Sequence, residues 1–179
     1  MTFYKNKTIW ITGASSGIGK EMAIQLSKHA KQLILSSRNT AALNDVKDLC
    51  HSDSDIQIIA IDLEDHEGLA EVFKNHHSIL KDVDILINNG GISQRSLAID
   101  TDFSVYKKLI DVNYLGSLKL TLLMLPIFKQ RNSGHLVVTS SVAGKFGVPL
   151  RTGYSASKFA LHGFYEGLRA ELYKTKITI

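Results

Sequence analysis

The chain has 179 residues, 44% of them hydrophobic, which is long enough for one globular domain with a sizeable buried core. Its single cysteine, Cys50, excludes an internal disulfide framework and a zinc site built on thiolates, and it predicts a reducing compartment. The formal net charge is +4, but the scattered lysines favour a solvated surface over a nucleic-acid-binding face. No apolar run approaches the ~20 residues of a membrane span, and the first residues lack the apolar segment of a signal peptide. We therefore expect one cytoplasmic domain (residues 1–179) with no metal site and no nucleic-acid or membrane partner.

Short apolar runs alternate with helical patterns along the chain, which is typical of βαβ units and a parallel sheet. The predicted strands are 8–12, 32–36, 56–61, 84–87 and 135–139, and the predicted helices are 18–28, 41–50, 68–80, 104–130 and 154–174. The helix from Ser104 is apolar on more than one side, so we expect it to be buried, with a kink at Pro126. Residues 175–179 resemble the beginning of a sixth strand. The sequence thus predicts a doubly wound α/β fold, with helices on both faces of the sheet and the last strands missing or incomplete.

A glycine series directly follows the first predicted strand and precedes the first predicted helix: Gly13-Ala14-Ser15-Ser16-Gly17-Ile18-Gly19. Glycines at such a point let the backbone approach a pyrophosphate, whose charge the N–H groups of the helix N-terminus can bind. The spacing is G-x-x-x-G-x-G, which departs from the G-x-G-x-x-G of most dinucleotide folds. Glycines also form ordinary turns. The position of this series between strand and helix nevertheless predicts a nucleotide cofactor.

Tyr154 and Lys158 are four residues apart at the start of the last predicted helix and therefore lie on one face of it. A phenol beside an ammonium can donate a proton and can also exist as a phenolate, because the cation favours the charged form. The same spacing also arises by chance on solvated helix faces. The pair alone is therefore a weak indication of acid/base chemistry.

Further polar residues follow two of the predicted strands. Ser140 and Ser141 come after the fifth apolar run, and Asn88-Asn89-Gly90-Gly91 comes after the fourth. Ligands of open α/β sheets bind at the carboxyl ends of strands, where a serine hydroxyl can donate to a substrate oxygen that develops negative charge. Both serines could instead cap turns near Gly144. Because all these residues meet at one edge of the sheet, beside the glycine series, they favour a common site.

In this order, the motifs resemble those of the short-chain dehydrogenase/reductase family, over essentially the whole chain from Lys7 to Lys176. The matching positions are Thr12–Gly19, Asp62-Leu63, Asn88–Gly91, Asn113, Ser141, and Tyr154 with Lys158. Residues 88–96 and 140–147 look most like the branch of member-7-like dehydrogenase/reductases. The resemblance implies a Rossmann-type fold and hydride transfer between a nicotinamide and a small-molecule alcohol or carbonyl.

The family's mechanism implies a role for each of four residues. Tyr154 would be the general acid/base, and Lys158 would favour its phenolate form and hold the nicotinamide ribose. Ser141, which the family's spacing to Tyr154 favours over Ser140, would polarise the substrate oxygen. Asn113 would anchor a water that links the lysine to solvent, and it could also bond the backbone inside a buried helix.

The choice of cofactor depends on the end of the second strand. A carboxylate there would accept from a ribose 2′-hydroxyl, whereas an arginine binds a 2′-phosphate. Ser37 and Arg38 occupy this position, so we expect NADP(H) rather than NAD(H), although Arg38 could also be a surface charge or stack on the adenine. Asp62 would bond the adenine amino group or cap the next helix. The expected cofactor-binding residues are Gly13, Ser15, Ser16, Gly17, Ile18, Gly19, Arg38, Asp62, Leu63, Asn89, Gly90, Tyr154 and Lys158.

Two features depart from the family pattern. Gly90 replaces the usual alanine of the Asn-Asn-Ala-Gly motif, and the family's substrate lid and final strand have no counterpart after Ile179. We expect an NADP(H)-dependent oxidoreductase that interconverts a carbonyl and a secondary alcohol; the alternative is a catalytically incompetent nucleotide-binding fragment that acts as a sensor or subunit. By resemblance, the helices from Ser104 and Tyr154 would join subunits in a homodimer or homotetramer.

Overall fold

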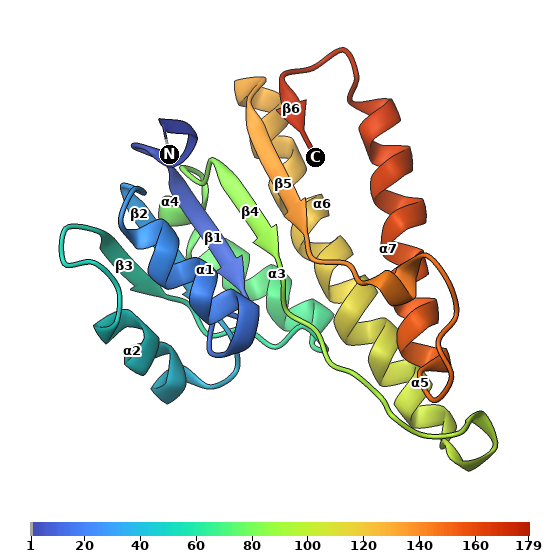
Figure 1. Ribbon diagram of the computed structural model, residues 1–179. Helices are drawn as coiled ribbons and strands as arrows, with labels where there is room; N and C mark the ends of the chain where they lie inside the picture. Colours follow the sequence, from blue (N-terminus) through green and yellow to red (C-terminus); the bar gives the residue numbers. More distant parts are fainter. Residues whose placement is uncertain (1) are drawn as a thin grey trace.

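Six parallel strands form one sheet in the order β3-β2-β1-β4-β5-β6 in the computed structural model, which describes residues 2–179 (Figure 1). The strands are β1 (Thr8–Thr12), β2 (Gln32–Ser36), β3 (Asp55–Ile58), β4 (Ile85–Asn88), β5 (Gly134–Val138) and β6 (Ile177–Thr178). The predicted doubly wound sheet is confirmed, including the short sixth strand. The strand order reverses between β1 and β4, and ligands of such sheets bind at this point.

Helices cover both faces of the sheet. The α-helices are α1 (Gly17–Ser27), α2 (Thr40–Asp48), α3 (His66–Asn75), α4 (His77–Leu80), α5 (Phe103–Ile110), α6 (Gly116–Arg131) and α7 (Thr152–Glu171). Three short 3-10 turns are η1 (Thr2–Tyr4), η2 (Ala98–Asp100) and η4 (Val142–Gly144). Helices α1 and α2 pack on one face, and α3, α6 and α7 pack on the other.

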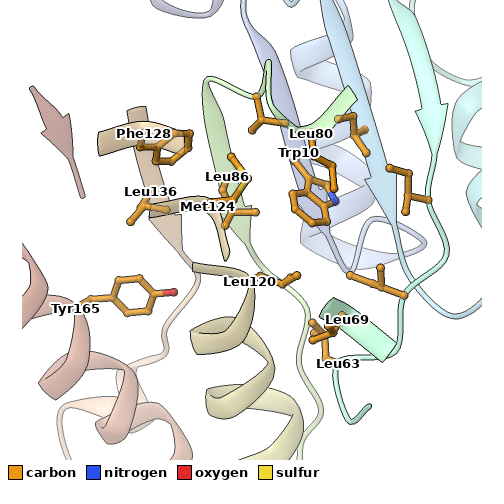
Figure 2. Packing of buried hydrophobic residues seen from close by; sticks show 14 of the residues in the cluster. Trp10, Leu63, Leu69, Leu80, Leu86, Leu120, Met124, Phe128, Leu136 and Tyr165 are labelled. Atoms are coloured by element: carbon orange, nitrogen blue, oxygen red, sulfur yellow. The ribbon is translucent and has the colours of Figure 1, made fainter. Parts of the chain in front are cut away.

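The strand residues alternate between two hydrophobic cores. In β1, Trp10 points toward α3 and α6, whereas its neighbours Ile9 and Ile11 point toward α1 and α2. Figure 2 shows the first of these cores, where Trp10 and Leu86 lie among side chains of the helices on this face, such as Leu120 and Met124. Burial on both faces is what a parallel sheet requires, and it explains why the strands have near-continuous apolar sequences.

The predicted long helix from Ser104 is interrupted by a π-helical turn. The turn, η3 (Asp111–Leu115), lies between α5 and α6, and in it the Gly116 N–H bonds the Asp111 carbonyl five residues back. Helix α6 continues through Pro126 to Arg131. The interruption of the long helix therefore lies at η3, whereas the sequence predicted a kink at Pro126. Such turns are frequent at functional sites.

Other boundaries differ from the prediction by a few residues. The predicted helix 68–80 is two helices that meet at His76, and the third strand ends at Ile58 instead of Ile61. Residues 59–61 are still held by β2, because Ile59 and Ile61 donate to the Leu35 and Ser37 carbonyls.

One helical stretch within residues 2–179, Phe103–Arg131, is long and apolar enough to cross a membrane by length and composition alone. A core helix has the same properties. In this stretch Leu120, Met124 and Phe128 recur at helical spacing and are fully packed against the sheet (Figure 2). Burial in the core of this fold therefore accounts for the apolar residues on one side of this stretch.

Candidate active site

The glycine series forms a tight turn from β1 into α1. Gly13 and Gly17 have φ of +64° and +53°, in the left-handed region that glycine adopts without strain. A Cβ on Gly13 would lie 2.6 Å from the Gly90 Cα, and a Cβ on Gly19 would collide with the Gly13 carbonyl. Gly19 therefore serves close packing, Gly17 serves backbone conformation, and Gly13 serves both.

The N-terminus of α1 points its N–H groups at this turn. Ser16 is the N-cap residue, but its side chain makes no capping hydrogen bond. The first N–H groups of α1 must therefore be satisfied from outside the helix, as at anion-binding helix N-termini. This arrangement fits the pyrophosphate of a dinucleotide.

Polar side chains tie the ends of three strands together beside the turn. The Thr12 hydroxyl accepts from the N–H groups of Asn89 and Gly90, both at 3.0 Å. The Asn89 amide donates to the Thr12 carbonyl at 3.2 Å and accepts from the Thr139 hydroxyl at 3.1 Å. These bonds join the ends of β1, β4 and β5, so the edge of the sheet is held in place without a ligand.

A cleft of about 340 Å³ opens at this edge. It is lined by Gly13, Ser15, Ser16, Ser37, Arg38, Asn39, Ile61, Asp62, Leu63, Asn89, Gly90, Gly91, Ile92 and Val112. Eight of the expected cofactor-binding residues are in this lining; Gly17, Ile18, Gly19, Tyr154 and Lys158 are not. Sequence reasoning missed Asn39, Ile61 and Val112, because nothing in their local sequence shows that the fold brings them to one cleft.

The end of β2 contributes one hydroxyl and one cation to the cleft. Ser37 and Arg38 both line it, and Asn39 caps α2 by accepting from the Ala42 N–H at 3.0 Å. Asp62 also lines the cleft and accepts from the Glu64 N–H at 3.0 Å. The cap of α3 is Asp65 instead, which accepts from the Gly68 N–H at 2.9 Å, so Asp62 does not cap this helix.

Tyr154 and Lys158 lie together on α7, as their spacing predicts. The Lys158 Nζ is 5.8 Å from the centroid of the Tyr154 ring and donates to the Thr139 carbonyl at 2.9 Å. The lysine is only 5% exposed, and this burial lowers its pKa from 10.5 to about 8. The pair is therefore not a chance pattern on a solvated helix face.

Asn113 lies in the π-helical turn and is 1% exposed. Its side-chain oxygen accepts from the Ile92 N–H at 2.7 Å, and its Nδ2 donates to the Ile92 carbonyl and to the Ser157 hydroxyl, both at 2.9 Å. Asn113 thus binds the backbone of the loop after β4, which is the structural alternative considered from the sequence. A Cβ on Gly91 would lie 3.0 Å from the Asn113 Oδ1 and 3.7 Å from the Lys158 Nζ, so this loop passes close to both residues.

The two serines after β5 have different surroundings. The Ser141 hydroxyl accepts from the Ala143 N–H at 3.1 Å and caps η4, which leaves its own proton free to donate. The Ser140 hydroxyl is instead 2.8 Å from the His162 Nε2, beside a second cavity of about 320 Å³. The two neighbouring serines therefore have different hydrogen-bond partners, and the choice of Ser141 over Ser140 stays a prediction.

A buried polar cluster behind β4 was not predicted from the sequence. The Asn88 amide donates to the Thr121 hydroxyl and the Tyr165 hydroxyl, both at 3.0 Å, and these two hydroxyls are 2.8 Å apart. Burial raises the pKa of Tyr165. The cluster connects the site edge of β4 to α6 and α7, and Figure 2 shows the Tyr165 hydroxyl pointing into the core.

Comparisons with known proteins agree with this geometry. A family model for short chain dehydrogenases matches residues 7–179. The human dehydrogenase/reductase SDR family member 7 is 46% identical over 172 residues, which cover 92% of this chain and 50% of that protein. The chain spans about half the length of the curated relatives it matches.

Two solved structures share the fold. A short-chain dehydrogenase/reductase from Burkholderia phymatum in complex with NAD has a TM-score of 0.91 and 24% identity, and the match covers 99% of this chain and 65% of that one. A putative NAD(P)-dependent gluconate 5-dehydrogenase from Beutenbergia cavernae with bound NADP has a TM-score of 0.90 and 25% identity, covering 97% and 69%. The site geometry and the family match lead to one conclusion: the chain belongs to the short-chain dehydrogenase/reductase family of oxidoreductases.

Proposed function

We propose that the chain is the cofactor-binding and catalytic portion of an NADP(H)-dependent oxidoreductase that interconverts a carbonyl and a secondary alcohol. The observation that carries this proposal is the pairing of the Tyr154 ring with the buried Lys158 ammonium, next to the strand ends that line the cleft. A nicotinamide cofactor bound in that cleft supplies or accepts the hydride. The close approach of Gly13 to Gly90 and the uncapped N-terminus of α1 fit the phosphates of such a cofactor.

Each residue of the site then has a chemical role. In the reductive direction, Tyr154 gives its phenolic proton to the carbonyl oxygen as the carbonyl carbon accepts the hydride, and in the oxidative direction it removes the proton from the alcohol. The Lys158 ammonium stabilises the phenolate that remains. Ser141 donates its free hydroxyl proton to the same substrate oxygen. Asn113 holds the loop after β4 beside Lys158, where a water could relay protons to solvent.

The preference for NADP(H) rests on the charge at the end of β2. Arg38 and Ser37 line the cleft where a carboxylate would repel a 2′-phosphate, and the guanidinium can bind that phosphate in a charge-assisted fork. We expect Arg38→Ala to weaken NADPH binding by about tenfold or more and NADH binding much less, measured by calorimetry. Equal weakening of both cofactors would refute a contact with the 2′-phosphate.

The test of the acid/base assignment is Tyr154→Phe, which removes the proton and keeps the ring. Single-turnover oxidation of NADPH with a panel of ketones should slow by about a hundredfold or more, while NADPH binding is unchanged. A variant that reacts as fast as the unchanged chain would refute the role of Tyr154. Tight NADPH binding by the unchanged chain, without turnover of any ketone, would instead favour a nucleotide-binding fragment that acts as a sensor or subunit.

A further inference from the structure

The chain segments around Tyr154 carry basic residues and no acidic ones. Residues 85–99, which include β4 and the loop after it, and residues 134–165, from β5 into α7, contain no Asp or Glu. The basic residues of the two segments are Arg95, Lys145, Arg151 and Lys158. A site built from such segments has a positive potential, which attracts and orients anionic ligands.

Two members of this group, Lys158 and Arg151, lie beside the Tyr154 ring, and Arg151 is the one that is not buried. Its Cζ is 5.8 Å from the centroid of the Tyr154 ring, the same distance as the Lys158 Nζ, and Arg151 precedes Tyr154 in the chain whereas Lys158 follows it. Its Nη1 donates to the Ser93 hydroxyl, on the loop after β4. Lys145, by contrast, is 3.9 Å from the Glu166 carboxylate, and none of the ion pairs found within residues 2–179 involves Arg151.

The backbone before Arg151 is held in an unfavourable conformation. Leu150 has a φ of +63°, in the left-handed region that costs a non-glycine residue roughly 1–2 kcal/mol. The Leu150 carbonyl accepts from the Ser96 N–H at 3.0 Å, and the Gly153 N–H donates to the Gln94 Oε1 at 3.2 Å. Strain of this kind persists where the surrounding structure requires it, often at binding sites. In this chain, the Leu150 conformation is accompanied by an Arg151 side chain that contacts both Ser93, on the loop after β4, and the Tyr154 ring.

We propose that Arg151 is a specificity-determining residue that binds a carboxylate of the substrate, so that the preferred substrates are oxo acids. This inference rests on the proposed function and adds a substrate class to it. The planar guanidinium pairs with a carboxylate through two parallel hydrogen bonds, and the bond to Ser93 uses only one of its N–H groups. The substrate would then present its carbonyl oxygen to Tyr154 and its carboxylate to Arg151.

The experiment compares matched acids and esters, acetoacetate with methyl acetoacetate and levulinate with methyl levulinate, as substrates of NADPH-dependent reduction. We expect the unchanged chain to have the higher kcat/KM for the acid of at least one pair. Arg151→Gln, which keeps a donor for Ser93 but loses the charge, should lower kcat/KM for that acid by about tenfold, mainly through KM, and leave the ester unaffected.

Two further variants separate recognition from structure. Arg151→Lys keeps the charge and should retain part of the preference for the acid. Arg95→Gln removes a charge from the loop after β4 and should retain all of that preference. Thermal unfolding shows whether each variant is folded. Two results would overturn the proposal: an equal loss on acid and ester in Arg151→Gln, or esters that react as well as their acids in both pairs with the unchanged chain.

A binding measurement distinguishes failure of this inference from failure of the proposed function. If the unchanged chain reduces no ketone, the proposed function fails, and the binding of acetoacetate and of its methyl ester to the NADPH-saturated chain is then compared by saturation-transfer NMR. Tighter binding of the acid that disappears in Arg151→Gln supports the carboxylate contact. Equal binding of acid and ester overturns it.

Discussion

At the scale of single residues, Lys158 shows how the fold prepares a cation for chemistry. Its aliphatic stem and ammonium are buried, and the carbonyl of Thr139 accepts one of its three N–H protons. Burial disfavours the charged form and lowers its pKa to about 8, so at pH 7 the ammonium is still mostly protonated. The charge that would stabilise a phenolate in the proposed mechanism is thus present at neutral pH, but it is held at a cost to stability.

This cost predicts a pH dependence of stability. The folded pKa of about 8 lies below the unfolded value of 10.5, so between these values the unfolded chain binds more protons than the folded chain. The free energy of unfolding attributable to Lys158 should therefore rise as the pH increases from about 8 to about 10, by at most about 3 kcal/mol, and be constant below pH 7. Urea denaturation across this range should show the rise in the unchanged chain.

The matched control is Lys158→Met, which keeps a long apolar side chain and removes the titrating group. As the pH rises through 8, the unchanged chain should gain stability relative to this variant, which has no group that titrates at this position. A difference that stays constant from pH 7 to pH 10 would contradict a depressed pKa of Lys158.

At the scale of elements, the π-helical turn η3 is stabilised by contacts from a distant loop. The Asp111 carbonyl accepts from the Gly116 N–H and also lies 3.1 Å from the His66 Nε2, at the start of α3. A Cβ on Gly116 would lie 2.5 Å from the Leu63 carbonyl oxygen, so only a glycine lets this loop pack against the turn. The loop that lines the cleft through Leu63 is therefore connected to the turn that carries Asn113.

We expect His66→Leu to destabilise this connection, because leucine fills a similar volume but has no N–H group to donate to the Asp111 carbonyl. The loss should be about 1 kcal/mol, measured as a lower thermal unfolding temperature, together with weaker NADPH binding. His66→Gln offers an amide N–H in place of the imidazole and should recover most of both properties. If the Leu and Gln variants behave alike, the hydrogen bond to Asp111 does not support the turn.

At the scale of the whole molecule, the surface of α6 and α7 exposes apolar side chains that the chain itself does not cover. Leu122 on α6 is 50% exposed and Phe159 on α7 is 44% exposed. On α7, a Cβ added to Gly163 or Gly167 would meet nothing within 4 Å. These helices lie side by side at one end of the molecule (Figure 1). Exposed apolar surface is often part of a protein interface, and the contact between subunits expected from the sequence stays a prediction.

The expected outcome is that the chain forms a homodimer or homotetramer that the double variant Leu122→Glu with Phe159→Glu dissociates. Sedimentation velocity should show the unchanged chain as an oligomer and the double variant as a folded monomer. Leu49→Glu, at a residue 54% exposed at the end of α2, is the matched control and should leave the oligomer intact. A monomeric unchanged chain would refute the predicted contact.

Local patterns in the sequence determined most of the sheet and the positions of the motifs. Strands buried on both faces need continuous apolar runs, and the left-handed backbone at positions 13 and 17 favours glycine. Both features can be recognised along the chain. Tyr154 and Lys158 share a helix, so their proximity follows from a spacing of four.

Contacts between distant segments were decided only by the tertiary structure. The π-helical turn is in contact with His66 and Leu63, which precede it by nearly fifty residues. The proline at position 126, from which an irregularity was predicted, lies outside this turn. Likewise, Ser140 and Ser141 have the same side chain and differ because one meets His162 and the other caps η4. The burial of Lys158 and the position of Arg151 against Ser93 also arise from packing between elements, which a spacing along one helix does not encode.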